Sequence, residues 1–250
     1  VSDTLDKYFP EFTEGSKVTL HHLLAMRSGL ADFFSDNADT EALAEQITLD
    51  NTDEQNTAAV KEWVFSHSQN VEPDVLYEYS NVNYILLGNI VEQVSGKRYI
   101  DFLRESFFAR LEMNHTGSIY ELKDKPVWAE AFHYKTEELQ VGIEPGLAKG
   151  AGDIIATAAD MTRWMNMLPS GKILSAESYQ AMITDFSYGY GYGLRTDIGN
   201  GAGHFGMIGV FRSGDYFDPA QKLTAFAAGN LGEDAVVEKQ LYELLGDLAK

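Results

Sequence analysis

The chain has 250 residues, and its 38 acidic and 19 basic side chains give a formal net charge of −19. Nucleic acid and anionic membrane surfaces are therefore not expected partners, because a protein that binds either needs a basic footprint. The sequence has no cysteine, which excludes disulfides and thiolate chemistry, and no apolar run approaches the roughly 18 residues of a membrane-spanning helix.

The N-terminal residues carry two helix signals. Residues 3–10 predict a short helix ended by its proline. Thr19 is a good cap for a second helix, with Gly29 as its stop. Adjacent helix residues face different ways, so we interpret His21 and His22 as ordinary helix residues and not as metal ligands or acid–base groups.

Capping signals mark three further helices. Thr52 and Gln55 form a capping box, and Thr157 and Asp160 form another. Ser175 is a third cap, in front of a helix expected to end near residue 182.

Residues 76–99 read as a loop that turns directly into a buried helix. The loop delivers Tyr79, Ser80 and Asn81, and either of the last two can cap the helix. Within the helix, apolar residues recur at three- and four-residue steps, at Val82, Ile85, Leu86, Ile90, Val91 and Val94. Gly96 ends the helix at a position that favours a left-handed backbone conformation. A helix anchored in this way would hold its N-terminal loop rigidly, as a catalytic side chain requires.

The character of the sequence changes near Ser187. Residues 188–196 alternate at period two, which predicts a strand, and residues 233–248 predict a closing amphipathic helix. Asp215 and Asp218 are expected to mark a hairpin turn. Further strand candidates are Gly203–Gly206, Val210–Phe217 and Lys222–Gly229.

These elements predict an α+β fold with an antiparallel sheet flanked by helices. We expect residues 1–186 to form a mostly helical region that carries the Tyr79–Asn81 triplet. Residues 187–250 would form the sheet and the C-terminal helix, and the two would pack as one intimate unit. An apolar content of 44% is sufficient for a sizeable core.

The triplet Y-S-N at 79–81 resembles the second motif, Y-x-N, of the serine β-lactamase and penicillin-binding-protein superfamily. The resemblance is strongest to its class C β-lactamase, D,D-carboxypeptidase and esterase-like branch. The triplet alone is a weak signal, but residues 18–30 resemble that family's I-T-I-R-H-L-L-T-H-T-S-G-L segment. Residues 150–165 resemble its A-G-G-L-x-S-T-A-x-D-L stretch, and residues 204–206 map onto its third motif.

The resemblance implies a role for each matching residue. Tyr79 would take part in proton transfer, Asn81 would contact the substrate amide, and His204 would face the substrate from the third motif. A phenol with a pKa near 10 is a poor base at neutral pH, so Tyr79 would need nearby cations. The other implied substrate-binding positions, with backbone N–H groups for an oxyanion hole among them, are Gly206, Met207 and Gly209.

Two departures from the family pattern qualify the expected function. Phe205 replaces the usual hydroxyl residue, which often helps to bind a substrate carboxylate, so esters or amides without that carboxylate are favoured. No serine in the chain is followed three residues later by lysine, and Ser95 with Lys97 misses that spacing. We expect the nucleophile segment to lie before Val1, so that this chain is a truncated form.

The leading hypothesis is a serine hydrolase that acts through an acyl-enzyme on a β-lactam, a D-alanyl peptide or a carboxylic ester, inactive as this fragment. The alternative is a catalytically dead ligand-binding or regulatory protein on the same fold. Neither hypothesis requires a metal or cofactor. The histidines do not have the spacing of metal ligands. Residues 201–206 spell G-x-G-x-x-G, the fingerprint of a dinucleotide-binding site, but a strand pattern follows them where that site needs a helix.

The expected partners are a small-molecule or peptide substrate and either a second copy of the chain or the missing N-terminal segment. Without that segment, the sheet would have an exposed edge that invites pairing. The resemblance, together with the lack of cysteine, favours a periplasmic or secreted protein.

Overall fold

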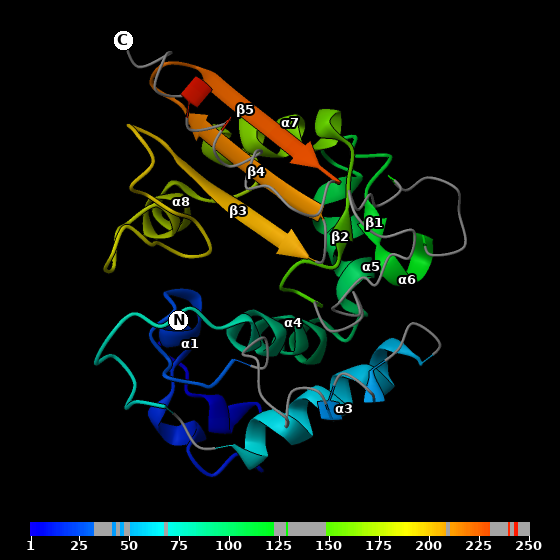
Figure 1. Ribbon diagram of the computed structural model, residues 1–250, viewed down its shortest axis with the longest axis vertical. Helices are drawn as coiled ribbons and strands as arrows, with labels where there is room; N and C mark the ends of the chain where they lie inside the picture. The colour runs from blue at the N-terminus through cyan, green and yellow to red at the C-terminus, as the bar shows by residue number, and fades with distance from the viewer. Residues whose placement is uncertain are drawn as a thin grey trace, which may run out of the picture. The chain divides into compact units, whose positions relative to one another are not determined.

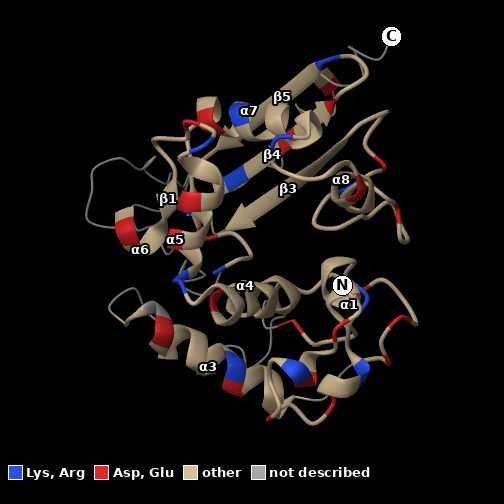
Figure 2. Ribbon diagram, turned by 180° about the vertical axis from the view of Figure 1, so that it is seen from behind, with Lys and Arg blue, Asp and Glu red and all other residues tan. Residues whose placement is uncertain are grey.

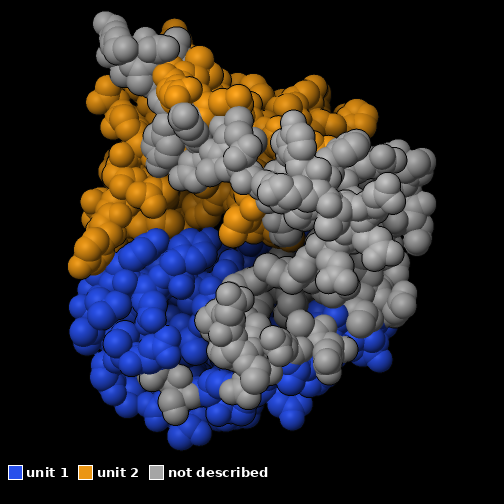
Figure 3. Space-filling view, in the orientation of Figure 1, with its two compact units in different colours: residues 1–103, 118–120, 144–154 blue, residues 104–117, 121–143, 155–250 orange. Residues whose placement is uncertain are grey.

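The computed structural model describes residues 1–32, 42–43, 46–47, 51–67, 70–122, 129, 149–208, 211–230, 240 and 243–244 (Figure 1). The chain divides by its contacts into two units, which are described separately (Figure 3). Unit 1 comprises residues 1–103, 118–120 and 144–154, and unit 2 comprises the rest. This division follows contacts, and the expected boundary near residue 187, which follows composition, stays a prediction.

Unit 1 is built around helix α4, Asn81–Ser95, which contacts three further helices of this unit (Figure 1). These helices are α1 (Leu20–Leu24), α3 (Asp53–Ser66) and α5 (Tyr99–Leu103). The buried face of α4 comprises Val82, Asn83, Ile85, Leu86, Gly88, Asn89 and Ile90. The helix ends at Gly96 with φ 67°, as the sequence predicted. The prediction for Val94 was wrong, because this member of the expected apolar stripe is 72% exposed.

The N-terminal helices are shorter than expected. Within residues 3–10 only Leu5–Lys7 is helical, as a 3₁₀ turn. Thr19 caps α1 in a capping box with His22, but the helix ends at Leu24, five residues before Gly29. Gly29 instead permits a close approach of two chain segments, because at φ 70° a Cβ added to it would lie 2.0 Å from the Val71 carbonyl oxygen.

An ion pair between a buried lysine and a partly exposed glutamate joins residue 149 to α4. Lys149 is 4% exposed, and its Nζ donates to Glu92 Oε2 at 2.7 Å and to Thr57 Oγ1 at 3.2 Å. Glu92 Oε1 also accepts from the Tyr99 amide at 2.7 Å, at the start of α5. Lys149 therefore binds α3 and α4 directly, and Glu92 extends this connection to the start of α5.

The sheet of unit 2 is antiparallel in the order β3-β4-β5 (Figure 1). Its strands are β3 (Ala202–Ile208), β4 (Phe211–Asp218) and β5 (Leu223–Gly229), which agree with the three strand candidates from the sequence. Helix α7, Ala158–Met167, contacts β4 and β5 and covers one face. The core between them comprises Met165, Leu168, Leu194, Ala202 and Phe217.

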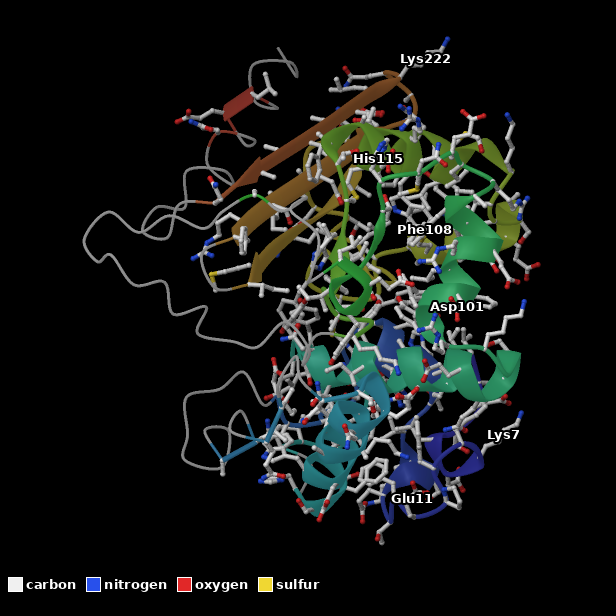
Figure 4. The ribbon with its side chains drawn as sticks, turned by 90° about the vertical axis from the view of Figure 1, so that its right-hand side faces the viewer. Lys7, Glu11, Asp101, Phe108, His115 and Lys222 are labelled. Carbon is white, nitrogen blue, oxygen red and sulfur yellow. The ribbon has the colours of Figure 1, made fainter. Side chains whose placement is uncertain are left out.

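Shorter elements complete the described structure. They are helices α6 (Ile119–Leu122) and α8 (Ala176–Met182), a π-helical turn at Arg104–Phe108, 3₁₀ turns at Gly15–Lys17 and Leu168–Ser170, and strands β1 (Gly117–Ser118) and β2 (Ile154–Ile155), which pair. Ser175 caps α8 and Thr157 caps α7 as expected. The Asp160 carboxylate does not close the expected capping box. It accepts from Thr116 Oγ1 and from the backbone amide of His115 (labelled in Figure 4), both at 2.9 Å.

Residues 188–196 do not form the expected strand. They form tight turns with isolated bridges, and Tyr188, Gly189 and Gly193 have positive φ angles. A Cβ at Gly191 would lie 2.3 Å from the Met182 carbonyl oxygen. The alternating glycines therefore mark left-handed turns and close backbone approaches, which a period-two pattern cannot distinguish from a strand.

Acidic side chains lie on elements of both units (Figure 2), in keeping with the net charge of −19. Within the residues that the structure describes, none of the helices has the length and apolarity that a membrane crossing needs. The described residues also contain no group of three or more His, Asp or Glu side chains placed to hold a metal ion. Of the expected helix at 233–248, Gln240, Glu243 and Leu244 are described and helical, and its other residues lie outside the described part.

The ion pair of Lys149 predicts a large loss of stability when the cation alone is removed. Lys149→Met removes the ammonium that compensates the partly desolvated carboxylate of Glu92. The variant should therefore have a free energy of unfolding lower by about 2 to 4 kcal/mol. Chemical denaturation followed by circular dichroism measures this change. Adding Glu92→Gln to the variant should restore part of the loss.

The matched control is Lys7→Met. Lys7 also pairs with a carboxylate, Asp3 at 2.6 Å, but its side chain is 60% exposed and points outward (Figure 4). Surface pairs contribute little, so this variant should change stability far less. Equal effects of the two lysine substitutions would contradict the assignment of Lys149 as a buried tie.

Candidate active site

The loop before α4 is fixed to the chain segment that follows α1. Residues 26–29 and 70–78 are joined by backbone bonds from Asn70 N to Gly29 O (2.8 Å), Asp74 N to Arg27 O (2.8 Å) and Glu78 N to Met26 O (2.9 Å). The Arg27 guanidinium adds an ion pair to Asp74 at 2.6 Å. The loop that carries Tyr79 thus has a continuous backbone support, which any side chain at Gly29 would disrupt.

A buried polar network lies beneath the triplet. Ser28 Oγ donates to Asn83 Oδ1 at 2.6 Å, and Asn83 Nδ2 donates to Met26 Sδ at 3.3 Å. The Ser80 amide also points at Met26 Sδ, at 3.5 Å. Ser28, Asn83 and Ser80 are fully buried, and Met26 is 1% exposed. Because a buried polar group without a partner is costly, this network holds the start of α4 in one position.

Ser80 does not cap α4 with its side chain. It occupies the N-cap position, but its hydroxyl donates to the Ala31 carbonyl at 3.4 Å and makes no capping bond. Asn81, the other expected cap, is the first residue of the helix. Ser80 is therefore a buried anchor between the exposed Tyr79 and the half-buried Asn81.

Tyr79 stands beside that anchor with 41% of its surface exposed. Partial burial of the phenol, with smaller contributions from Tyr77 and the negative charge of Asp32, raises the pKa of Tyr79 to about 12. At neutral pH the side chain is consequently a neutral phenol within this unit. It can donate a proton, but it would accept one only if a cation were brought close to it.

The Asn81 side chain is held by a residue that sequence reasoning missed. Asn81 Nδ2 donates to Asp32 Oδ2 at 2.8 Å. Asp32 lies 49 positions earlier in the chain, so no local pattern could have indicated this contact. It places a carboxylate in contact with Asn81, and the charge of that carboxylate also reaches Tyr79.

In unit 2, the third motif lies on β3. The His204 ring contacts Tyr190, with Nε2 3.2 Å from the phenol oxygen and the rings edge to face at 6.0 Å. Its backbone amide donates to Asp215 Oδ1 at 2.8 Å. Burial, assisted by the charge of Arg195, lowers the pKa of His204 below its usual value. The imidazole is therefore neutral at neutral pH and can serve as a hydrogen-bonding group.

Asp215 is the second residue that the sequence did not single out for the site. Contrary to expectation it does not mark the hairpin turn, which follows Asp218, but lies inside β4 opposite His204. Its neighbour on the other side is Phe226 of β5. Burial of the carboxyl raises the pKa of Asp215 to about 6, although the bond from the His204 amide acts against the rise.

The remaining predicted residues lie towards the end of β3. The Phe205 ring packs beside the buried cluster of Ile198 and Tyr216 and offers no hydrogen-bonding group where the family has a hydroxyl. Gly206 is exposed, and Met207 is 67% exposed. Gly209 lies outside the described residues. The structure thus brings Tyr79 and Asn81 together in unit 1, and His204, Gly206 and Met207 together in unit 2.

The raised pKa of Asp215 predicts a pH-dependent stability. Its folded-state pKa of about 6 exceeds the ordinary value of 3.8, so its favourable contribution is present at low pH and is lost as the pH rises through about 6. Asp215→Asn keeps an acceptor for the His204 amide and stays neutral. Between about pH 4.5 and pH 7, the unfolding free energy of the native protein relative to this variant should fall by about 2 kcal/mol.

Denaturant titrations at several pH values measure that difference. Other carboxylates titrate in both proteins, so the comparison isolates Asp215. A difference that does not change with pH would show that the carboxyl is not desolvated on β4.

Comparisons with known proteins agree with the resemblance in the sequence. The chain is similar to the putative penicillin-binding protein PbpX of Bacillus subtilis (strain 168), with 27% identity over 252 residues that cover 98% of this chain and 60% of the relative. It is also similar to the teichoic acid D-alanine hydrolase of Staphylococcus aureus (strain MRSA252), with 22% identity over 83% of this chain and 51% of the relative. The chain thus spans about half to three fifths of these curated relatives.

Solved structures of the same fold cover nearly the whole chain. The D-amino acid amidase from Ochrobactrum anthropi SV3 has a TM-score of 0.80 and 25% identity, covering 98% of this chain and 78% of its own. The penicillin-binding protein from Bacillus halodurans has a TM-score of 0.75 and 21% identity, covering 97% and 77%. These likenesses confirm the predicted α+β, β-lactamase/transpeptidase-like fold.

The family model described as Beta-lactamase matches residues 1–250. Together with the named relatives, this match shows that the chain belongs to the β-lactamase family, within the serine β-lactamase and penicillin-binding-protein superfamily.

Proposed function

We propose that the protein is a serine hydrolase that acts through an acyl-enzyme on a D-aminoacyl ester or amide. The observation that carries this proposal is the mounting of Tyr79 and Asn81 on a buried polar network at the start of α4, at positions that match the family's second motif. A rigid mount of this kind is what a catalytic constellation requires and what a surface loop does not need.

The choice of substrate class rests on two lines of support. Relatives of this chain include a teichoic acid D-alanine hydrolase and a D-amino acid amidase, whose names point to D-aminoacyl substrates. Phe205 fills the position of the hydroxyl residue that helps many family members to bind a substrate carboxylate, and its ring packs by Ile198 and Tyr216. A D-aminoacyl ester or amide has no carboxylate beyond the scissile bond, so it does not need that hydroxyl.

In the proposed reaction, a serine oxygen supplied by sequence outside these 250 residues attacks the scissile carbonyl. The serine proton passes by way of Tyr79 to the leaving alcohol or amine, so that the C–O or C–N bond breaks with a neutral leaving group. Water then hydrolyses the acyl-serine and regenerates the enzyme. Asn81 and His204 would position the substrate, and backbone N–H groups near Gly206, Met207 and Gly209 would stabilise the oxyanion.

The high pKa of Tyr79 fits this scheme only if a cation joins it. In unit 1 the surroundings of the phenol favour its neutral form. The lysine of the family's S-x-x-K motif would supply the missing positive charge and lower the pKa of the phenol. We therefore propose that catalysis requires the full-length gene product.

Tyr79→Phe tests the proposal in that full-length protein. Loss of the proton-transferring hydroxyl should lower kcat on a D-alanyl ester by about 10²- to 10⁴-fold and leave KM nearly unchanged. Steady-state kinetics on the purified protein measure both constants. The matched control is Tyr8→Phe, which removes a hydroxyl bonded to Asp3 at 2.8 Å on the same unit and should leave both constants unchanged.

Two outcomes would count against the proposal. A Tyr79→Phe variant with native kcat would remove Tyr79 from the chemistry. A full-length protein that binds D-alanyl esters or amides and turns none of them over would favour the alternative, a ligand-binding or regulatory protein on this fold.

A further inference from the structure

The carboxylate of Asp32 fixes which end of the Asn81 amide faces which way. An ionised carboxylate can only accept hydrogen bonds, so the group that approaches Asp32 Oδ2 at 2.8 Å must be the NH2 of Asn81. The Oδ1 of Asn81 then lies on the opposite edge of the planar amide group. The assignment of the two amide atoms thus follows from the chemistry of the partner.

This arrangement gives the triplet an acceptor character. A carboxylate has about four acceptor sites, so Asp32 can accept from more than one donor at the same time. Asn81 adds the acceptor Oδ1, and Asp32 is only half-buried. The negative charge of Asp32 also reaches Tyr79, where it favours the uncharged phenol. A ligand group that meets Asp32 and Asn81 together would be stabilised if it were a cationic donor and destabilised if it were an anion.

We propose that Asp32 is a specificity-determining residue whose carboxylate, together with Asn81 Oδ1, binds the protonated amino group of an aminoacyl ester or amide. This inference rests on the proposed function and deepens it, because it names the part of the substrate that Asp32 recognises. The resemblance implies that Asn81 contacts the substrate amide, so a group held by Asn81 and Asp32 together would lie near the scissile bond. On the acyl side of an aminoacyl ester or amide, the α-amino group is the polar group nearest the scissile carbonyl.

The inference predicts discrimination against substrates whose amino group is blocked. An N-acetyl group removes the charge and two of the three N–H donors, and it places a carbonyl oxygen among acceptors. Hydrogen bonds between charged partners are strong enough that their loss lowers kcat/KM by about 10- to 100-fold. The general negative charge of the chain cannot give the same result, because exposed charges farther than about 10 Å away are screened by salt.

The test compares D-alanine p-nitroanilide with its N-acetyl derivative on the full-length protein, on Asp32→Asn and on a matched control. The asparagine side chain is isosteric with that of aspartate and can still accept from Asn81 through its carbonyl, so the orientation of Asn81 is kept while the charge is lost. The control, Asp101→Asn, removes one carboxylate from the same unit, where Asp101 (labelled in Figure 4) pairs with Arg98 at 2.6 Å.

We expect the native protein to prefer the free amine by at least about tenfold in kcat/KM. Asp32→Asn should lower kcat/KM for the free amine by about 10- to 100-fold and change the N-acetyl value less than about threefold. Asp101→Asn should leave both values unchanged. The preference of the native protein should also decline as the pH rises through about 8, where an α-amino group loses its proton, and Asp32→Asn should lack this decline.

Equal losses on both substrates in Asp32→Asn would overturn the inference, because a purely structural role would act on both. Hydrolysis of the N-acetyl substrate with no preference for the free amine would also overturn it, while the proposed hydrolase function would stand. A native protein that neither hydrolyses nor is acylated by either substrate would overturn both this inference and the proposed hydrolase function.

Discussion

The bond from Ser28 Oγ to Asn83 Oδ1 is the interaction on which the rest of unit 1 depends. Both residues are fully buried, and an unpaired amide in that position would cost about 1 to 3 kcal/mol. The segment after α1 must therefore stay on α4. The loop that ends in Tyr79 is bonded along that same segment, so the positions of Tyr79 and Asn81 follow from a contact that neither of them makes.

Burial dominates the electrostatics of both units. It raises the pKa of Tyr79 in unit 1, and in unit 2 it raises that of Asp215 and lowers that of His204. Each shift favours the neutral form of its side chain, so Tyr79 and His204 are uncharged hydrogen-bonding groups at neutral pH, whereas the charge of Asp215 depends on the pH near 6. The carboxylate of Asp32, bonded to Asn81, gives the inference about an amino group its physical basis. Under the proposed mechanism, the lysine of the family's S-x-x-K motif would supply the positive charge that Tyr79 needs.

The sequence predicted the elements whose causes are local. The capping box of Thr52 and Gln55, the left-handed end of α4 at Gly96 and the three strands of the sheet are read from neighbouring residues. The family resemblance added Tyr79, Asn81 and His204 as candidate site residues, whose roles stay predictions.

The features that the sequence did not predict depend on contacts between distant residues. Asp32 lies 49 positions from Asn81, and Asp215 reaches the His204 amide across two strands. The Tyr-Gly alternation of residues 188–193 resembles a strand in one dimension, yet its glycines are required by close approaches such as that of Gly191 to Met182. Ser80 was expected to cap α4, but it is a buried anchor. Its hydroxyl binds the Ala31 carbonyl and its amide binds Met26 Sδ, and both partners lie inside the unit.

Whether the full-length protein forms an acyl-enzyme tests this account most directly. The measurement is the intact mass of the protein after brief exposure to a D-alanyl ester and acid quench, followed by peptide mapping. The account predicts one added D-alanyl group, on a serine outside residues 1–250 that is followed three positions later by lysine. No added mass in a protein that turns the ester over, or an acyl group on a residue within this chain, would contradict it.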